Sequence, residues 1–370
     1  MSKKEKVKII KEKKKVNWFV IFKFLRTLWR NDAVVEVATT TGWYWSLIVF
    51  VLALGISVLP ATVSQATAQG SNFIGATNLS YSDSYYNGLY DYATSEETPL
   101  ISFNKESKKL EEDTPVSAKY ENYKLADELT NAYKPIYSYV RDNDGKKENY
   151  LDIYVVKTSE TETLNSILNN VQNTNTNFAD GYTTDTSVKH TRSNPFILFT
   201  TDGFYAVNYS ANGSTSLSGN FAHIQESFNA LKDTYTLKDV LLYEVTLGKG
   251  TIHEDQEAIF NNFLKYCDSV YIDVRWQSTW VTFGIYCGVN GSIMILMGLI
   301  IWLMTRGKNN PNNKTKIWEA YSMAFWSSSS PALLSLFGFL FPQIGMMLFI
   351  MLYAFRVMFL SMRQLRPVYQ

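Results

Sequence analysis

The sequence predicts an integral membrane protein with four transmembrane α-helices, both chain ends in the cytoplasm, and one α+β domain outside it between the first two spans. Two observations predict this class. The chain contains long uncharged apolar runs, and its charges are segregated although the net charge is only +1. Residues 65–279 contain 29 Asp and Glu against 17 Lys and Arg, whereas the rest of the chain contains 18 basic and 5 acidic residues. A membrane imposes such a pattern, because basic flanks are retained on the cytoplasmic side.

Four predicted spans follow from the apolar runs, since about 20 residues of helix cross the hydrocarbon core. They cover residues 43–63, 280–304, 321–341 and 344–362. The basic segments at 1–42, 305–320 and 363–370 then all lie on one side, which the excess of Lys and Arg identifies as the cytoplasm. Trp43 and Trp45, at the start of the first span, are predicted membrane-interface anchors.

The first span has an alternative interpretation as a signal peptide. Ala66-Thr67-Ala68 resembles a small-residue cleavage site that follows a basic region and an apolar run. However, the basic segment of residues 1–42 is long for a signal peptide, and the apolar run is long enough to span. We therefore expect the span to be retained, whereas cleavage would leave three spans.

The basic N-terminal segment contains a predicted amphipathic helix at Val16–Arg30. Its apolar residues recur at spacings of three and four and are Trp18, Ile21, Phe22, Leu25, Leu28 and Trp29. Such a helix is expected to lie in the membrane interface and to be attracted to the anionic inner leaflet, with Trp18, Phe22 and Trp29 as anchors. The alternative is a docking helix for a cytoplasmic partner.

The predicted outside domain, residues 65–279, is long enough for one hydrophobic core. Gln65–Thr98 is rich in Ser, Thr, Asn, Gly and Tyr and predicts an irregular stalk or a loosely packed edge of the domain. Strand and helix patterns intermix in the remainder, which predicts an α+β domain. The predicted strands are Ile136–Val140, Tyr150–Val156, Phe196–Thr200, Phe204–Tyr209, Val240–Val245 and Val270–Trp276. Thr201-Asp202-Gly203 predicts that the third and fourth of these form a hairpin with an Asp-Gly turn. The predicted helices are Glu160–Val171, Phe221–Leu231 and one that begins at a capping box of Thr251 and Glu254.

No residue pattern predicts catalysis, a metal site or a cofactor, and the sequence contains no glycine-rich phosphate loop or nucleophile elbow. Cys267 and Cys287 are predicted to be buried thiols rather than a disulfide. Asp142-Asn143-Asp144-Gly145 lacks the other ligands of a calcium loop and is explained by a hairpin turn. The histidines, which have no metal-ligand spacing and are expected at the surface or in caps, are His190, His223 and His253.

Polar residues inside the third and fourth spans form a candidate intramembrane site. Ser327–Ser330 precede Pro331, a pattern that indicates either a substrate path at a broken helix or hydroxyls that satisfy backbone groups freed by the proline. We favour the second interpretation. Arg356 is the one charge well inside a span. It either pairs with Glu319, at the inner start of the third span, or extends to the interface.

A cluster of tyrosines in the predicted stalk is a second candidate site. Aromatic faces beside carboxylates are what a sugar site requires, and Asp83 and Asp91 lie among these tyrosines. An amphipathic segment that lies on a domain has the same composition, so both interpretations stay open. The tyrosines are Tyr81, Tyr85, Tyr86, Tyr90 and Tyr92.

Three short motifs carry a resemblance to a known family. They are Phe22-Lys23-Phe24-Leu25-Arg26-Thr27-Leu28-Trp29, Gly55-Ile56-Ser57-Val58-Leu59-Pro60 and Ser330-Pro331-Ala332-Leu333-Leu334. With the layout of one early span, an outside domain and late spans, they resemble a domain-of-unknown-function family of bacterial membrane proteins that includes the maltodextrin-utilisation membrane protein. The resemblance implies an accessory role near solute uptake and supplies no catalytic residues.

The sequence as a whole favours a non-enzymatic accessory or interaction subunit of a larger membrane complex, acting through its outside domain. Its expected partners are the lipid bilayer and other membrane-protein subunits, with no nucleic acid. One alternative is a transporter or channel subunit with a path at Ser327–Pro331 and Arg356. A second is an outside solute-binding receptor or hydrolase that uses the tyrosine stretch. The sequence does not predict the oligomeric state.

Overall fold

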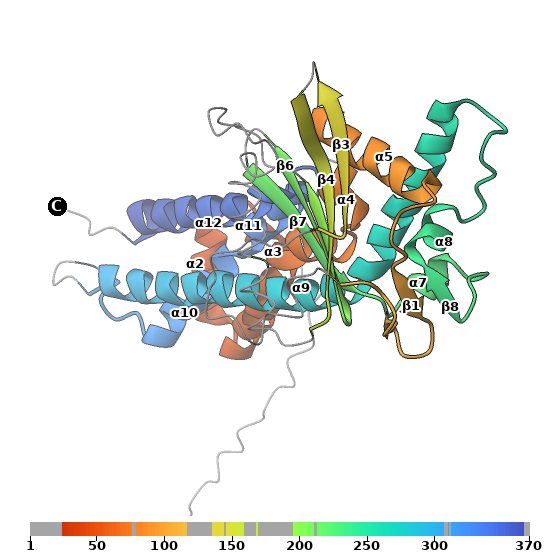
Figure 1. Ribbon diagram of the computed structural model, residues 1–370. Helices are drawn as coiled ribbons and strands as arrows, with labels where there is room; N and C mark the ends of the chain where they lie inside the picture. The colour runs from red at the N-terminus through yellow and green to blue at the C-terminus, as the bar shows by residue number, and fades with distance from the viewer. Residues whose placement is uncertain are drawn as a thin grey trace, which may run out of the picture. The chain divides into compact units, whose positions relative to one another are not determined.

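The computed structural model describes residues 24–75, 79–116, 135–143, 146–158, 168, 195–210, 213–306, 310 and 312–365. The chain divides into two compact units (Figure 1). The helical unit comprises residues 1–67 and 278–370, and the sheet unit comprises residues 68–277. Each unit has its own hydrophobic core.

The helical unit is built around one long apolar helix, α3. Its elements are α2 (Asn31–Thr40), α3 (Trp43–Ala66), the part of α9 (Ile252–Met304) from residue 278 on, α10 (Ile317–Ser327), α11 (Ser329–Ser335), the 3₁₀ helix η2 (Leu336–Phe339) and α12 (Pro342–Gln364). The segments α10, α11 and η2 contact α3 one after another. Ser322 shares a hydrogen bond with Ser46, and the rings of Phe325 and Phe50 lie 4.6 Å apart. These contacts show that α10 runs parallel to α3.

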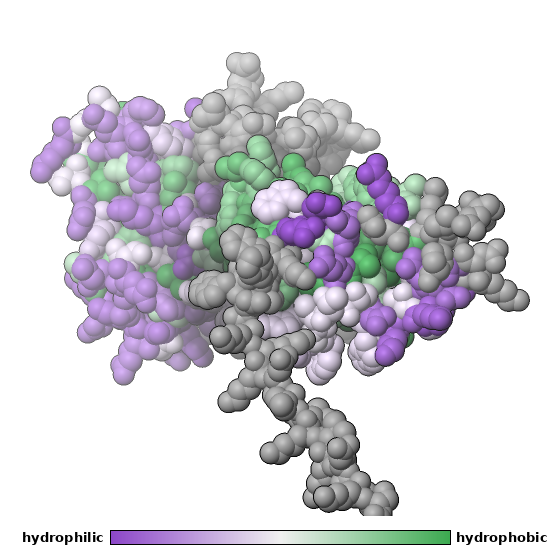
Figure 2. Space-filling model, turned by 180° about the vertical axis from the view of Figure 1, so that it is seen from behind, coloured by the Kyte–Doolittle hydropathy of each residue, from purple (hydrophilic) through white to green (hydrophobic). Residues whose placement is uncertain are grey.

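Two helices, α3 and α9, are long and apolar enough to cross a membrane. They include the first two predicted spans. In each helix only 28% of the most apolar 18-residue window is buried, so most of the apolar surface is left uncovered. Figure 2 shows such hydrophobic side chains at the surface over the helices.

The third predicted span, residues 321–341, is not one continuous helix. It is interrupted at Ser328 between α10 and α11 and tightens into η2 at Leu336. Pro331 is the physical cause of the first interruption, because it has no N–H to donate to the carbonyl of Ser327. The fourth predicted span, residues 344–362, lies within the single helix α12.

The helix α2 was not predicted from the sequence. Its residues Val34, Val37 and Ala38 belong to the core of the helical unit, and α2 packs on α10 and α12. The predicted helix at Val16–Arg30 lies mostly outside the described residues. Residues 24–26 are helical and 27–29 form a turn, so that helix ends before α2 begins.

The sheet unit contains a five-stranded sheet with the order β3-β4-β5-β6-β7. Its strands are β3 (Tyr137–Asn143), β4 (Lys146–Val156), β5 (Phe196–Thr200), β6 (Gly203–Ser210) and β7 (Gly213–Asn220). The pair β4 and β5 is parallel and the other pairs are antiparallel. The two predicted hairpins, β3–β4 and β5–β6, are confirmed, and β7 was not predicted.

Both faces of this sheet are buried, as the alternation along β4 shows. Ile153 and Val155 enter the main core, whereas Tyr154 and Val156 enter a smaller cluster on the opposite face. Leu168, which has helical conformation, packs against that smaller cluster. Parallel strands need a long crossover connection, and Leu168 belongs to the connection between β4 and β5. The rest of the predicted helix Glu160–Val171 lies outside the described residues.

Helix α5 (Leu79–Thr94) replaces the irregular stalk that was predicted for residues 65–98. Tyr85, Leu89 and Tyr92, at spacings of four and three, are fully buried in the main core. The short helix α4 (Ser71–Gly75) precedes it, and Figure 1 shows α5 beside β3 and β4. The stalk prediction was wrong because burial of one helical face outweighs the low helix propensity of Ser, Asn and Tyr.

The first part of α9 is the second helix of the main core. Thr251 and Glu254 form the predicted capping box, in which the backbone N–H of Thr251 donates to Glu254 at 2.7 Å. Phe263, Cys267 and Val270 are fully buried along one helical face. The predicted strand Val270–Trp276 is therefore wrong, because the helical period of the preceding residues continues through it.

Smaller elements complete the sheet unit. They are β1 (Ser102–Asn104), β2 (Lys109–Leu110), β8 (Thr234–Thr236), α7 (Ile224–Ser227) and α8 (Leu237–Leu241), of which β2, β1 and β8 form a three-stranded sheet. The predicted strand Val240–Val245 is wrong, since Thr236 and Asp239 form a capping box that begins α8. The predicted helix Phe221–Leu231 shrinks to α7, which ends where Phe228 leaves helical conformation.

Two fully buried tyrosines of the main core differ in their hydroxyl partners. The Tyr85 hydroxyl donates to the carbonyl of Val207 at 2.9 Å, whereas the Tyr266 hydroxyl has no hydrogen-bond partner in the described part of the chain. We expect Tyr85→Phe to lower the free energy of unfolding by about 1–2 kcal/mol, and Tyr266→Phe to leave it unchanged or raise it. Urea-dependent proteolysis of the sheet unit in the full chain measures both; equal losses in the two variants would contradict this.

A buried carboxyl in β4 makes the stability of the sheet unit depend on pH. Burial raises the pKa of Asp152 to about 6, although the Ser138 hydroxyl donates to it at 2.6 Å. A raised folded-state pKa means that its contribution to stability is present below about pH 4 and is lost as pH rises through 6. The loss is roughly 3 kcal/mol. We expect Asp152→Asn to remove this pH dependence and to be at least as stable at pH 7.5; an unchanged pH profile would contradict the assignment.

Candidate functional site in the helical unit

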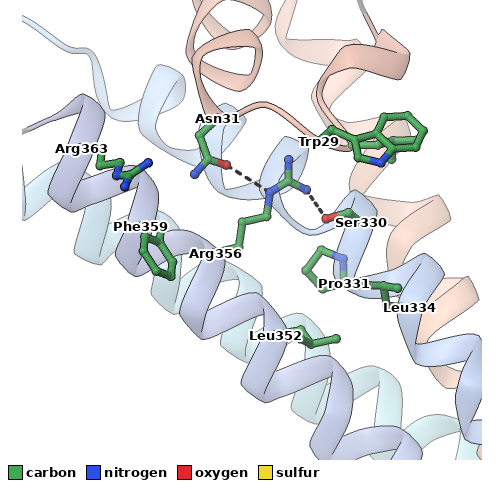
Figure 3. A pocket seen from close by; sticks show the side chains of 10 residues that line it. Trp29, Asn31, Ser330, Pro331, Leu334, Leu352, Arg356, Phe359 and Arg363 are labelled. Atoms are coloured by element: carbon green, nitrogen blue, oxygen red, sulfur yellow. Dashed lines mark hydrogen bonds between the residues drawn. The ribbon is translucent and has the colours of Figure 1, made fainter.

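A pocket of about 380 Å³ lies in the helical unit between the turn before α2, helix α11 and helix α12. Arg356 lies at its centre, with its guanidinium between Asn31 and Ser330 (Figure 3). In this view Pro331 and Leu334 lie on the same side of Arg356 as Ser330, and Leu352 lies below them. The lining residues are Leu28, Trp29, Asn31, Ser330, Pro331, Leu334, Leu352, Arg356, Phe359 and Arg363.

The interruption between α10 and α11 positions the Arg356 side chain. Pro331 leaves the carbonyl of Ser327 without its helical N–H donor. Arg356 Nη1 donates to this carbonyl at 3.2 Å and to the Ser330 hydroxyl at 2.6 Å. The arginine of α12 therefore compensates for the proline in the neighbouring helical segment.

The remaining contacts of Arg356 join α12 to the turn before α2. Nη2 donates to the carbonyl of Thr27, and Nε donates to Asn31 Oδ1 at 3.4 Å. All of these acceptors are neutral, and no carboxylate among the described residues forms an ion pair with Arg356. The predicted partner Glu319 instead accepts from the backbone N–H of Lys316 at 2.8 Å, which caps the start of α10. That pairing was wrong because the free N–H groups of a helix start are a closer partner for a carboxylate at the third helical position.

The serine hydroxyls before Pro331 do not bond the carbonyl that the proline frees, since that carbonyl accepts from Arg356 instead. The hydroxyls of Ser328 and Ser329 donate to the carbonyls of Phe325 and Trp326, each at 2.7 Å. Each of these hydroxyls therefore bonds a carbonyl three residues earlier in the chain. Ser327 is different, since its hydroxyl is buried without a hydrogen-bond partner in the described part of the chain.

A second cation and several apolar side chains complete the pocket. Arg363 lies seven residues after Arg356 on α12, and its side chain is exposed. Leu334, Phe359 and Trp29 are 43%, 49% and 80% exposed. The pocket therefore combines two guanidinium groups with an uncovered apolar margin, an arrangement suited to an anionic group attached to an apolar one.

The predicted interface anchors are in part described. Trp43 and Trp45, in the first turn of α3, are 68% and 38% exposed, and Trp29 is more exposed still. Trp18 and Phe22 lie outside the described residues. Insertion of these rings into a membrane interface stays a prediction.

The tyrosine stretch is divided between the core and the surface. Tyr85 and Tyr92 are fully buried, so the structure corrects their assignment as rings that stack on a ligand. The Tyr86 hydroxyl lies 2.7 Å from His253 Nδ1, and Tyr90 packs partly against the main core. The side chain of Tyr81 lies outside the described set. The sequence could not distinguish these roles because they depend on which face of α5 meets the sheet.

A polar cluster on the sheet unit was not predicted. His223 contacts Glu226 at 2.7 Å and Asp273 at 2.9 Å, and Asn220 donates to Asp273 at 2.9 Å. The hydrogen bond to Glu226, together with Asp273, raises the pKa of His223; the Asn220 amide and His223 lower the pKa of Asp273. The sequence did not indicate this cluster, because Asp273 lies in α9, 50 residues after His223. Among the described residues, no group of three or more His, Cys, Asp or Glu is arranged to hold a metal ion.

The cysteines are separate thiols. Cys267 is fully buried in the main core and Cys287 is half-buried in α9. Cys267 therefore agrees with its prediction as a buried small residue, while Cys287 is less covered than expected.

Comparison with known proteins identifies no relative of this chain. No protein-family model, no curated protein and no solved structure matches it. The basis for a function is therefore the two units and the pocket around Arg356 and Arg363, here called the arginine pocket.

Proposed function

We propose that this chain is a multi-pass plasma-membrane protein that serves as an accessory or interaction subunit of a larger membrane complex through its sheet unit. The observation that carries the proposal is the uncovered apolar surface of α3 and α9. In each helix only 28% of the apolar 18-residue window is buried. Exposed apolar area of this extent is typical of surfaces that contact lipid or other subunits. The folded sheet unit, with its own core, supplies the surface for partners.

The proposed topology has four spans, namely α3, the second part of α9, the sequence α10–α11–η2, and α12. Asn310 supports it, because its amide donates to the carbonyls of Met304 and Leu365 at 3.1 and 2.9 Å. These bonds bring the ends of α9 and α12 together at the loop that precedes α10. The basic residues at this end, which include Arg306, Lys316 and Arg363, favour a cytoplasmic location. The sheet unit then lies outside the cytoplasm.

The direct test of the interaction role is crosslinked affinity purification of the intact chain from native membranes, read by mass spectrometry. We expect stoichiometric recovery of other membrane-protein subunits, and solute-uptake subunits would agree with the family resemblance. Recovery of this chain alone, in a discrete oligomer, would contradict the accessory role and favour a self-contained channel or receptor.

A second candidate function, a transporter or channel subunit, is favoured by the interrupted helix at Ser328. Interrupted helices line substrate paths in several transporter folds. Against this, Arg356 donates to the carbonyl that Pro331 frees, and the hydroxyls of Ser328 and Ser329 are engaged by carbonyls three residues earlier. Transport that persists when Ser330→Ala removes the hydroxyl partner of Arg356 would argue against a path at this position.

A further inference from the structure

We propose that the arginine pocket binds the phosphate of an anionic phospholipid headgroup. The proposal rests on the membrane placement proposed above and adds a ligand class that the interaction role does not require. It starts from the two guanidinium groups on α12, Arg356 and Arg363, which line one pocket.

The charge of Arg356 is compensated only by neutral oxygen atoms in the described part of the chain. Its four contacts use four of the five guanidinium N–H groups, which leaves one Nη2 hydrogen for a ligand. Arg363 has no ion pair with any described carboxylate. A partly desolvated cation without an anion is costly, and a phosphate bound in this pocket would offset the cost.

The apolar margin selects a lipid rather than free phosphate. Phe359, Leu334 and Trp29 remain exposed beside the cationic centre, and inorganic phosphate would leave them uncovered. A phospholipid places its phosphate on the arginines and its acyl chains along these side chains. The volume of about 380 Å³ lies within the range of small-ligand sites.

The position of the pocket agrees with this ligand. It lies at the end of the helical unit where the C-terminus of α12 and the turn before α2 meet. Basic pockets between transmembrane helices on the cytoplasmic side are suited to anionic lipid headgroups. Other basic residues at this end, such as Arg306, are already occupied, since Arg306 donates to Thr315 at 3.1 Å.

Native mass spectrometry of the full chain in neutral detergent tests the proposal. Phosphatidylglycerol and phosphatidylcholine are added in equal amounts, and the test variant is Arg363→Gln, which leaves the contacts of Arg356 intact. The matched control is Arg26→Gln, which removes an exposed positive charge outside the pocket. We expect one retained phosphatidylglycerol, roughly five- to tenfold weaker retention in Arg363→Gln, and a change of less than about twofold in Arg26→Gln.

Three outcomes would overturn the proposal. They are equal retention of the two lipids, equal losses in Arg363→Gln and Arg26→Gln, and displacement of phosphatidylglycerol by equimolar inorganic phosphate, which would identify a free-phosphate site. Lipid retention requires no protein partner. A purification that recovers no other subunit would therefore contradict the proposed interaction role without contradicting lipid binding.

Discussion

Gly219→Ala is expected to destabilise the sheet unit by about 3 kcal/mol or more. Gly219 lies in β7 where the strand crosses α9, and a Cβ at this position would lie 2.1 Å from the carbonyl oxygen of Val270. Both sides of the contact are backbone, so no side chain can move aside. Separating β7 from α9 would open the main core around Leu217 and Val270, and overpacking of this kind typically costs 1–3 kcal/mol or more. Urea-dependent proteolysis of the full chain measures the effect.

The matched control for this prediction is Ser216→Ala in the same strand. Ser216 is exposed, so the substitution changes strand composition without adding an atom to a crowded contact. We expect its effect to stay within about 0.5 kcal/mol. A Gly219→Ala variant as stable as Ser216→Ala would show that β7 and α9 do not approach as the structure describes.

Arg356→Leu is expected to destabilise the helical unit by about 2–3 kcal/mol. The substitution leaves the carbonyl of Ser327 without a donor, because Pro331 cannot supply one, and removes the donor to Thr27. Removal of the partly desolvated charge offsets part of this loss, so the expected net effect is smaller than the sum of the lost hydrogen bonds. Thermal unfolding of the full chain in detergent measures the loss.

The matched control here is Arg363→Leu, which removes the same charge one heptad later on α12. Arg363 is exposed and has no intramolecular ion pair among the described residues, so we expect an effect within about 0.5 kcal/mol. Equal losses in the two variants would indicate that net charge, rather than the hydrogen bonds of Arg356, stabilises the unit.

Local signals in the sequence predicted part of this fold. The Thr251–Glu254 capping box and the β5–β6 hairpin are confirmed, because each depends on residues that are close in the sequence. The two most apolar runs lie in α3 and α9, where composition alone identifies the helices. Signals of this kind need no knowledge of tertiary contacts.

The remaining features depend on long-range packing. Helix α5 is stabilised by burying Tyr85 and Tyr92 against the sheet, although its composition indicates a stalk. Arg356 was identified as a candidate, but its acceptors come from Thr27 and Ser327, which are distant in the sequence. The His223–Asp273 contact also joins distant segments. Sequence patterns identify such residues one at a time and do not show which of them meet.

The orientation of the sheet unit across a membrane is the central claim, and cysteine accessibility tests it most directly. Lys249→Cys places a thiol on an exposed residue of the sheet unit, and Lys314→Cys places one on the exposed loop before α10. The parent chain, whose Cys267 is buried, gives the background. In intact cells, a membrane-impermeant maleimide should label Lys249→Cys at once and Lys314→Cys only after lysis. Labelling of both variants in intact cells, or of Lys314→Cys alone, would contradict the proposed topology.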